Sequence, residues 1–180
     1  MSAPSGTKAH LTGVETFFGE EEIIVSKTDL SGRITYCNDV FMRVSGYTER
    51  ELLGVPHSIL RHPDMPRSVF KLLWDTIQGG EECFAYVVNR AKNGDHYWVL
   101  AHVTPSYDTA GRMVGFHSNR RTPERSAIET IAPIYQQLLG VERAAISKKA
   151  AIEAGEQALQ AFLDRTGLKY PELVFSLNAA

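Results

Sequence analysis

The fold of this chain is decided by two segments, Arg61-His62-Pro63-Asp64-Met65-Pro66 and Lys92-Asn93-Gly94-Asp95-His96-Tyr97-Trp98. The first places a cation, an imidazole and a carboxylate close together beside two prolines. The second is a polar turn that opens onto an aromatic strand, and its Asn-Gly pair is a strong signal for a tight hairpin. Neither segment has the layout of a catalytic centre. Together they indicate a ligand pocket built from a loop and a small antiparallel sheet.

The residues before the first segment predict a hairpin and then short helices. Strands are expected at 23–26 and 33–37, on either side of a turn that ends in a glycine. Asn38 can cap the helix that follows. Thr48 and Glu51 have the spacing of a capping box, which predicts the start of a second short helix.

A longer helix is expected from about residue 66 to residue 78, because its apolar residues recur at helical spacing. Pairing of consecutive strands then gives one five-stranded antiparallel sheet with helices on one face, an α+β fold. Its remaining strands are expected at 83–90, 96–105 and 113–120.

The pattern after Pro123 is helical, and Pro133 is expected to kink this helix or to move its start. We therefore divide the chain into an N-terminal arm (1–20), a domain that contains the sheet (21–122) and a C-terminal helical extension (123–180). The small-residue stripe at 145–165 allows two interpretations. These residues form either a signal-relaying connector or an appendage packed back on the sheet.

The composition narrows the classes of function. A formal net charge of −2 over 180 residues leaves no broad basic surface for nucleic acid. No apolar run approaches the roughly 18–20 residues that span a bilayer, and the first ten residues lack the apolar core of a secretory signal. A soluble cytoplasmic protein without direct membrane insertion is therefore expected. Cys37 and Cys83 are expected to be reduced.

Several shorter motifs accompany the two opening segments: Asn38-Asp39-Val40-Phe41, Ser45-Gly46-Tyr47, Gly54-Val55-Pro56-His57, Trp74 and Asn89-Arg90. With the order of elements, they resemble the PAS sensor domain of bacterial aerotaxis receptors over about residues 20–140. The resemblance implies a PAS fold and a non-covalently bound FAD. It also implies a sensor of redox state or oxygen that signals by conformational change in aerotaxis, and not an enzyme.

By this resemblance, the candidate pocket residues are Arg61, His62, Asp64, Trp74, Asn89 and Tyr97. Asn89 carries both a donor and an acceptor, which suits the uracil-like edge of a flavin. Arg61 can grip phosphate, His62 can change charge near neutral pH, and Asp64 can orient either of them. Trp74 or Tyr97 can form a wall of the slot.

The chain departs from the family at Cys83-Phe84-Ala85, where aerotaxis receptors usually have Trp-x-Gly. Side chains alternate along a strand, so an inward Asn89 also places Cys83 on the pocket side. Cys83 is therefore a further candidate pocket residue. The loss of the tryptophan predicts either an enlarged slot or a gap refilled by another side chain.

The opposite face of the same strands is also apolar, whereas a sheet face in contact with water should alternate with polar residues. The residues concerned are Phe84, Tyr86, Val88, Trp98, Leu100 and His102. Something must cover this face: the N-terminal arm through Phe17-Phe18, the C-terminal helices or a second subunit. We expect a homodimer.

Two other functions fit the same fold. A cofactor-free PAS module for dimerisation or protein interaction is favoured by Cys83-Phe84-Ala85. A haem-based gas sensor would need an axial histidine, for which His57 or His62 could serve. The histidine spacing gives no metal motif. No output domain fits in 124–180, so the signal must pass to a partner protein or to a downstream domain of a longer receptor.

Overall fold

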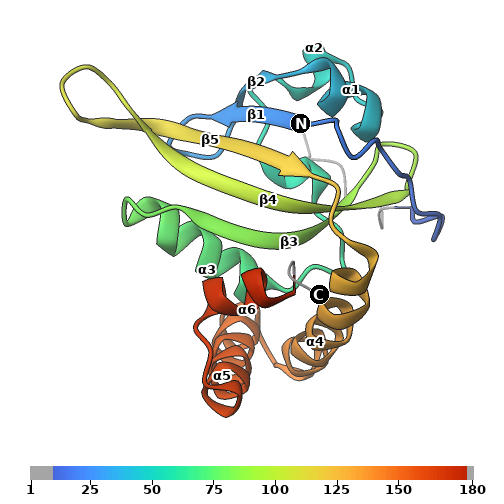
Figure 1. Cartoon of the computed structure of the whole chain (residues 1–180), viewed down its shortest axis with the longest axis vertical. Helices are drawn as coiled ribbons and strands as arrows, with labels where there is room; N and C mark the ends of the chain where they lie inside the picture. Colours follow the sequence, from blue (N-terminus) through green and yellow to red (C-terminus); the bar gives the residue numbers. More distant parts are fainter. Residues whose placement is uncertain (1–9, 178–180) are drawn as a thin grey trace, which may run out of the picture.

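The computed structural model describes residues 10–177 and contains a five-stranded antiparallel sheet in the order β2-β1-β5-β4-β3 (Figure 1). This confirms the predicted α+β fold. The tight turn at Asn93-Gly94 joins β3 to β4, and Asn89 pairs with Tyr97 across the two strands. The strands are β1 (Ile24–Thr28), β2 (Ile34–Cys37), β3 (Cys83–Arg90), β4 (His96–Tyr107) and β5 (Met113–Arg121).

The segment between β2 and β3 packs on one face of the sheet as four short helical elements. They are α1 (Asp39–Ser45), α2 (Glu49–Leu52), the 3₁₀ helix η1 (His57–Leu60) and α3 (Arg67–Gln78). The Oδ1 atom of Asn38 accepts from the backbone N–H of Phe41, as predicted for a helix cap, and also from Val25. The predicted capping box of Thr48 and Glu51 begins α2.

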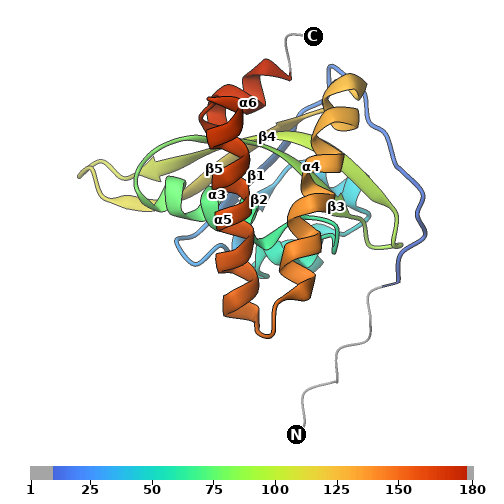
Figure 2. The ribbon, with the colours of Figure 1, turned by 90° about the horizontal axis from the view of Figure 1, so that it is seen from below.

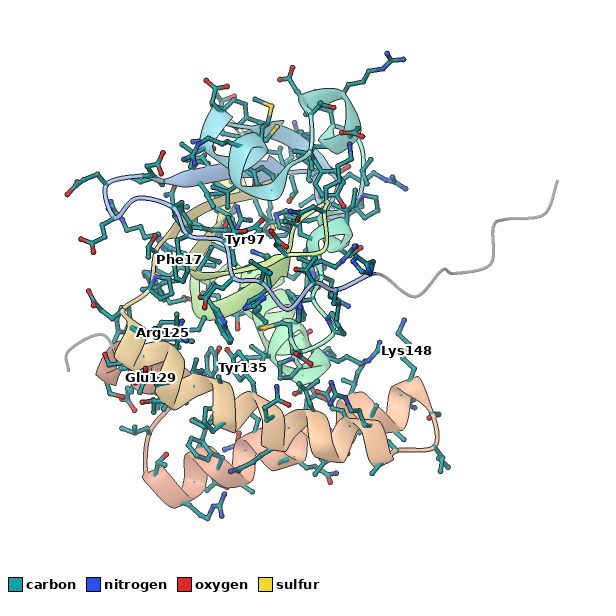
Figure 3. The ribbon with its side chains drawn as sticks, turned by 90° about the vertical axis from the view of Figure 1, so that its right-hand side faces the viewer. Phe17, Tyr97, Arg125, Glu129, Tyr135 and Lys148 are labelled. Atoms are coloured by element: carbon teal, nitrogen blue, oxygen red, sulfur yellow. The ribbon has the colours of Figure 1, made fainter. Side chains whose placement is uncertain are left out.

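The opposite face of the sheet is covered by the C-terminal helices α4 (Arg125–Ala144) and α6 (Tyr170–Ser176), whereas α5 (Lys148–Thr166) packs on α4 and α3 (Figures 1 and 2). The Tyr135 hydroxyl of α4 lies between this helix and the sheet and donates to the backbone carbonyl of Tyr86, 2.7 Å away (Figure 3). Phe175 of α6 contacts the ring of Phe84 at a centroid distance of 4.8 Å. The sequence leaves three candidates for the cover of this face, and the C-terminal helices of the chain itself are the main one.

Helices α4 and α5 form a hairpin that packs back on the domain, with α5 against α3. The buried side of α5 is formed by Ala151, Gly155, Leu159 and Leu163. Residues 145–165 therefore pack back on the domain, although on α3 and not on the sheet as the appendage alternative expects, and Ile146 at the hairpin turn is fully exposed. The shifted start that Pro133 could cause is not seen, because α4 begins at Arg125 and continues through the proline with buried residues on both sides of it.

The N-terminal arm runs beside β4, where His96 exchanges backbone hydrogen bonds with Val14 and Thr16. Phe18 is buried, whereas Phe17 points away from the core and is 68% exposed (Figure 3). The prediction about a leader segment concerns residues 1–9, which lie outside the described residues. Within 10–177, no helix has the length and apolarity that crossing a membrane requires.

The Tyr135 hydroxyl provides a test of how tightly α4 holds the sheet. Tyr135→Phe is expected to lower the free energy of unfolding by about 1–3 kcal/mol, since it leaves the buried Tyr86 carbonyl without its donor. Urea denaturation followed by circular dichroism measures the change. Tyr107→Phe, at an exposed tyrosine, is the matched control and should unfold like the wild type. Equal stability of all three proteins would contradict the docking of α4 described above.

Candidate functional site

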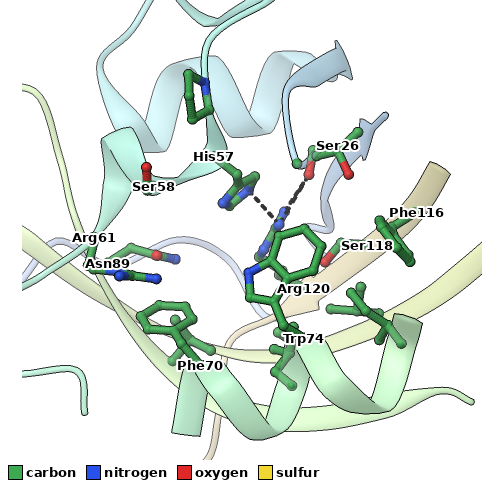
Figure 4. A pocket seen from close by; sticks show the side chains of 18 of the residues that line it. Ser26, His57, Ser58, Arg61, Phe70, Trp74, Asn89, Phe116, Ser118 and Arg120 are labelled. Atoms are coloured by element: carbon green, nitrogen blue, oxygen red, sulfur yellow. Dashed lines mark hydrogen bonds between the residues drawn. The ribbon is translucent and has the colours of Figure 1, made fainter. Parts of the chain in front are cut away.

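A cavity of about 400 Å³ lies between the inner face of the sheet, α3 and the segment around η1 (Figure 4). Ligand pockets in proteins range over roughly 300–1,000 Å³. Its lining combines apolar side chains, mainly from α3, with polar side chains from the sheet and from the segment around η1. The residues that define it are Ser26, His57, Ser58, Arg61, Phe70, Leu73, Trp74, Ile77, Val87, Asn89, Ala101, Val103, Phe116, Ser118 and Arg120.

Strand alternation places the polar groups of the sheet in this cavity. Asn89 of β3 and Ser118 and Arg120 of β5 face the same side, because alternate residues of a strand point to one face. Ala101 of β4 pairs with Arg120 and leaves space above the centre of the sheet. The small residue at this position is the reason that the long side chain of Arg120 can lie within the domain.

Helix α3 supplies the opposite wall through Phe70, Trp74 and neighbouring apolar residues at helical spacing. The Trp74 ring meets the ring of Phe116 edge-on at a centroid distance of 5.4 Å. Gly32 lies against the same indole with φ +79°, and a Cβ added there would lie 2.8 Å from the ring. The hairpin turn thus requires glycine both for its backbone conformation and for the Trp74 ring.

Three buried polar atoms of the cavity residues have no hydrogen-bond partner within the described part of the chain: Asn89 Nδ2, Arg61 Nε and Ser118 Oγ. An unpaired buried polar group costs about 1–3 kcal/mol. The Arg61 guanidinium lies 4.1 Å above the Phe70 ring centroid, and burial is the main reason that its pKa is lowered. Such unpartnered groups around one cavity are the arrangement expected where a polar ligand binds.

Arg120 gives the cavity its charge. The residue is only 6% exposed, and its guanidinium donates to Ser26 Oγ at 3.0 and 3.1 Å and to His57 Nε2 at 2.7 Å (Figure 4). Burial lowers the pKa of Arg120 to about 10, so it stays a cation at neutral pH. Burial and the neighbouring Arg120 lower the pKa of His57 to about 3, so the imidazole is neutral and accepts the bond.

The cavity therefore carries positive charge. Arg61 and Arg120 line it, and none of its lining residues within 10–177 is an aspartate or a glutamate. A buried cation without a carboxylate partner is costly, and an anionic or strongly polar ligand would offset that cost. The site can accordingly hold a flat ligand between apolar walls and pair with its polar or negatively charged edge.

The structure brings Arg61, Trp74 and Asn89 of the predicted residues together in this cavity. The sequence predicts His62 and Asp64 beside them, but both lie elsewhere: a turn from the His62 carbonyl to the Met65 N–H follows Arg61, and Asp64 pairs with Arg143 of α4. The side chains of His62 and Asp64 line a second cavity, of about 190 Å³, between the sheet, the arm and α4.

The other two predicted residues, Tyr97 and Cys83, are buried outside the lining of the cavity. The hydroxyl of Tyr97 has no partner among the described residues, and burial raises its pKa. Burial raises the pKa of Cys83 to about 11, so it is a neutral thiol. Val103, which pairs with Cys83 across the sheet, lines the cavity instead.

The sequence analysis missed the role of His57 and Arg120. The sequence indicates His57 only as a possible haem or metal ligand, and it does not indicate Arg120 as a pocket residue. The alternation of side chains along β5 could have indicated Arg120, since Phe116, Ser118 and Arg120 lie on the same face of the strand and all line the cavity. A buried arginine is nevertheless unusual enough that strand parity alone does not predict it.

Comparisons with known proteins agree with this fold. Residues 34–120 match the family model described as PAS fold. A light-oxygen-voltage domain studied with a flavin analogue superposes with a TM-score of 0.55 at 17% identity, covering 64% of this chain and 86% of that one. A PAS domain from Colwellia psychrerythraea gives 0.51 at 21% identity, covering 56% and 85%. The chain contains a PAS domain.

The sequence comparison is more specific. The aerotaxis receptor of Escherichia coli (strain K12) is 41% identical over 129 residues, which are 72% of this chain and 25% of the receptor. The nitrogen fixation regulatory protein of Klebsiella pneumoniae is 26% identical over 106 residues, covering 59% and 21%. The domain is a PAS domain of the aerotaxis-receptor type, and the chain spans about a quarter of that receptor's length.

The neutral state of His57 leads to a test by pH. Between its ordinary pKa of about 6.5 and its folded pKa of about 3, the unfolded chain binds a proton that the folded chain does not. The neutral His57 therefore contributes fully to the free energy of unfolding above about pH 6.5. This contribution declines by roughly 1 kcal/mol per pH unit as the pH falls toward 3. His57→Gln, which keeps an acceptor for Arg120, should reduce the loss of stability between about pH 6.5 and 5.

Urea denaturation at several pH values in this window measures the effect. His102→Gln is the control for loss of an imidazole, because His102 lies outside the cavity and pairs with Glu82. Identical pH dependence in the wild type and in His57→Gln would contradict a neutral, partly buried His57.

Proposed function

We propose that this chain is a cytoplasmic PAS sensor that binds FAD non-covalently and reports redox state or oxygen by conformational change in aerotaxis-type signalling. The proposed role is to bind and report rather than to catalyse. One observation carries the proposal: the unpartnered polar atoms of Arg61, Asn89 and Ser118 surround a single positively charged cavity with apolar walls.

The residues present fit a flavin. Phe70 and Trp74 offer aromatic surface to a flat ring. The Asn89 side chain has a free donor for the ring's uracil-like edge, and Arg61 and Arg120 favour a ligand with negative charge. When bound, a flavin supplies a redox centre whose charge and hydrogen bonding differ between its oxidation states.

The protein's part is to respond to that difference. Asn89 can exchange donor for acceptor by rotating its amide, since its Nδ2 is not held by another residue of 10–177. Arg120 is held by Ser26 and His57, and its charge is fixed at neutral pH. A change at the flavin edge is therefore expected to move Asn89 and the α3 wall before it moves Arg120.

Haem binding is the weaker alternative. The Nε2 atom of His57, which an axial ligand would use, already accepts from Arg120 at 2.7 Å, and His62 lines the other cavity. A cofactor-free module would leave the three cavity atoms without a partner among residues 10–177, so that only solvent could pair with them.

The homodimer stays a prediction. The sequence favours a dimer because the outer face of the sheet is apolar. In the structure this face is covered by α4 and α6 of the same chain. The signalling partner, or a downstream output domain, is likewise proposed, because the chain corresponds to a quarter of the related receptor. Sedimentation equilibrium of the purified protein tests the dimer.

The absorption spectrum of the freshly purified protein, with FAD titration of any colourless fraction, tests the proposed cofactor. Asn89→Ala is expected to weaken FAD binding by roughly 5- to 150-fold, which corresponds to loss of one buried hydrogen bond worth about 1–3 kcal/mol. The folded protein without ligand should lose little stability, because the Nδ2 atom has no partner there.

The matched control is Asn119→Ala, since Asn119 contacts His117 and is not one of the cavity residues. Its affinity for FAD should equal that of the wild type. A wild-type protein that shows neither flavin nor FAD uptake would overturn the proposed cofactor, and an intense Soret band would favour haem instead.

A further inference from the structure

A buried carboxylate on α4 caps the helix that forms the cavity wall. Glu142 is 6% exposed and accepts from the backbone N–H groups of Arg67 and Ser68, each at 2.9 Å, and from the Ser68 hydroxyl at 2.8 Å. These groups belong to the first turn of α3, whose own N-cap residue, Pro66, supplies no side-chain bond. A negative charge at this end of a helix is also favoured by the helix dipole.

The α4–α5 hairpin is built closely around this carboxylate. Gly155 of α5 faces it, and a Cβ added there would lie 2.6 Å from Glu142 Oε1 and 2.7 Å from Ser68 Oγ. A larger residue at this position would therefore require the Glu142 and Ser68 side chains, or α5 itself, to shift. The neighbouring Arg143 pairs with Asp64 at 3.0 Å, so two consecutive residues of α4 hold the segment that leads into α3.

The same segment reaches the cavity on its other side. Arg61 lines the cavity, and Glu142 lies near enough to oppose the lowering of the Arg61 pKa that burial and Arg67 cause. Phe70 and Trp74 lie on α3 a short distance beyond the capped turn and face the cavity. Helix α3 thus has one side toward the cavity and the other toward α5, where Lys71 also pairs with Glu156 at 3.8 Å.

We infer that Glu142 is a positioning residue that ties the cavity wall to the α4–α5 hairpin, so that filling of the cavity is transmitted to the hairpin through α3. This inference rests on the proposed function, because it takes the hairpin as the part of the chain that reports cavity occupancy. In this arrangement Asp64 and its loop join the cavity to α4 and do not contact the ligand.

Hydrogen–deuterium exchange of the α5 amides, measured with and without saturating FAD, tests the inference on the full chain. In the wild type, FAD should slow exchange in both α3 and α5, by at least about fivefold, the lower end of typical coupling between two sites. In Glu142→Gln, FAD should still slow exchange in α3, but the effect on α5 should be lost.

The matched control is Glu129→Gln, the same substitution on α4 at an exposed glutamate that pairs with Arg125 of the same helix; it should behave as the wild type. Ser68→Ala is a milder variant, which removes one of the three bonds to Glu142, and it should give an intermediate response if Glu142→Gln fails to fold. An α5 response in Glu142→Gln and Ser68→Ala equal to that of the wild type would overturn the inference. So would FAD binding without any α5 response in the wild type.

A ligand-free comparison separates this result from failure of the proposed function. Absence of FAD uptake contradicts the proposed cofactor only, and Trp74→Ala then replaces the ligand as the disturbance of the cavity wall. It should speed α5 exchange by at least about fivefold in the wild-type background and have little effect in the Glu142→Gln background. Equal effects in both backgrounds would overturn the inference.

Discussion

The sheet has two buried faces, and this constraint shapes the rest of the molecule. In the central part of the sheet, the side chains of β3, β4 and β5 alternate between the cavity and the C-terminal helices. On the cavity side this alternation gathers Asn89, Ser118 and Arg120. On the other side it gathers aromatic residues that pack on α4 and α6. A shift of one residue in register would exchange the two sets and place Arg120 against apolar helices.

Much of the fold could be predicted because its signals are local. The cap at Asn38, the turn at Asn93-Gly94 and the apolar spacing of α3 each depend on residues close in sequence. The candidate site was harder to predict. Arg61 and Asn89 were identified correctly as cavity residues, whereas His62 and Asp64 were not, because the path of their loop depends on contacts with α4. Such contacts leave no signal in a short window of sequence.

Arg120 could not be predicted as a cavity residue because it is charged. An arginine near the end of a strand is ordinarily solvated, and its burial here depends on partners from two other elements, Ser26 and His57. Neither partner is acidic, so the cation is held in place without being neutralised. The same feature that makes the residue hard to predict makes the cavity selective, because an uncharged apolar ligand would leave the cost of burying Arg120 without an offset.

The two sides of the cavity differ in how they can respond to a ligand. The strands are fixed by continuous ladders and by helices packed on their far face, so a displacement there would break many hydrogen bonds at once. Helix α3 receives no capping bond from its own N-cap residue. Its first turn is capped instead by the Glu142 carboxylate, which accepts from the backbone N–H groups of Arg67 and Ser68. A small rotation of α3 would lengthen those bonds first. For this reason the capped end of α3, rather than the sheet, is where we place the link between the cavity and the α4–α5 hairpin.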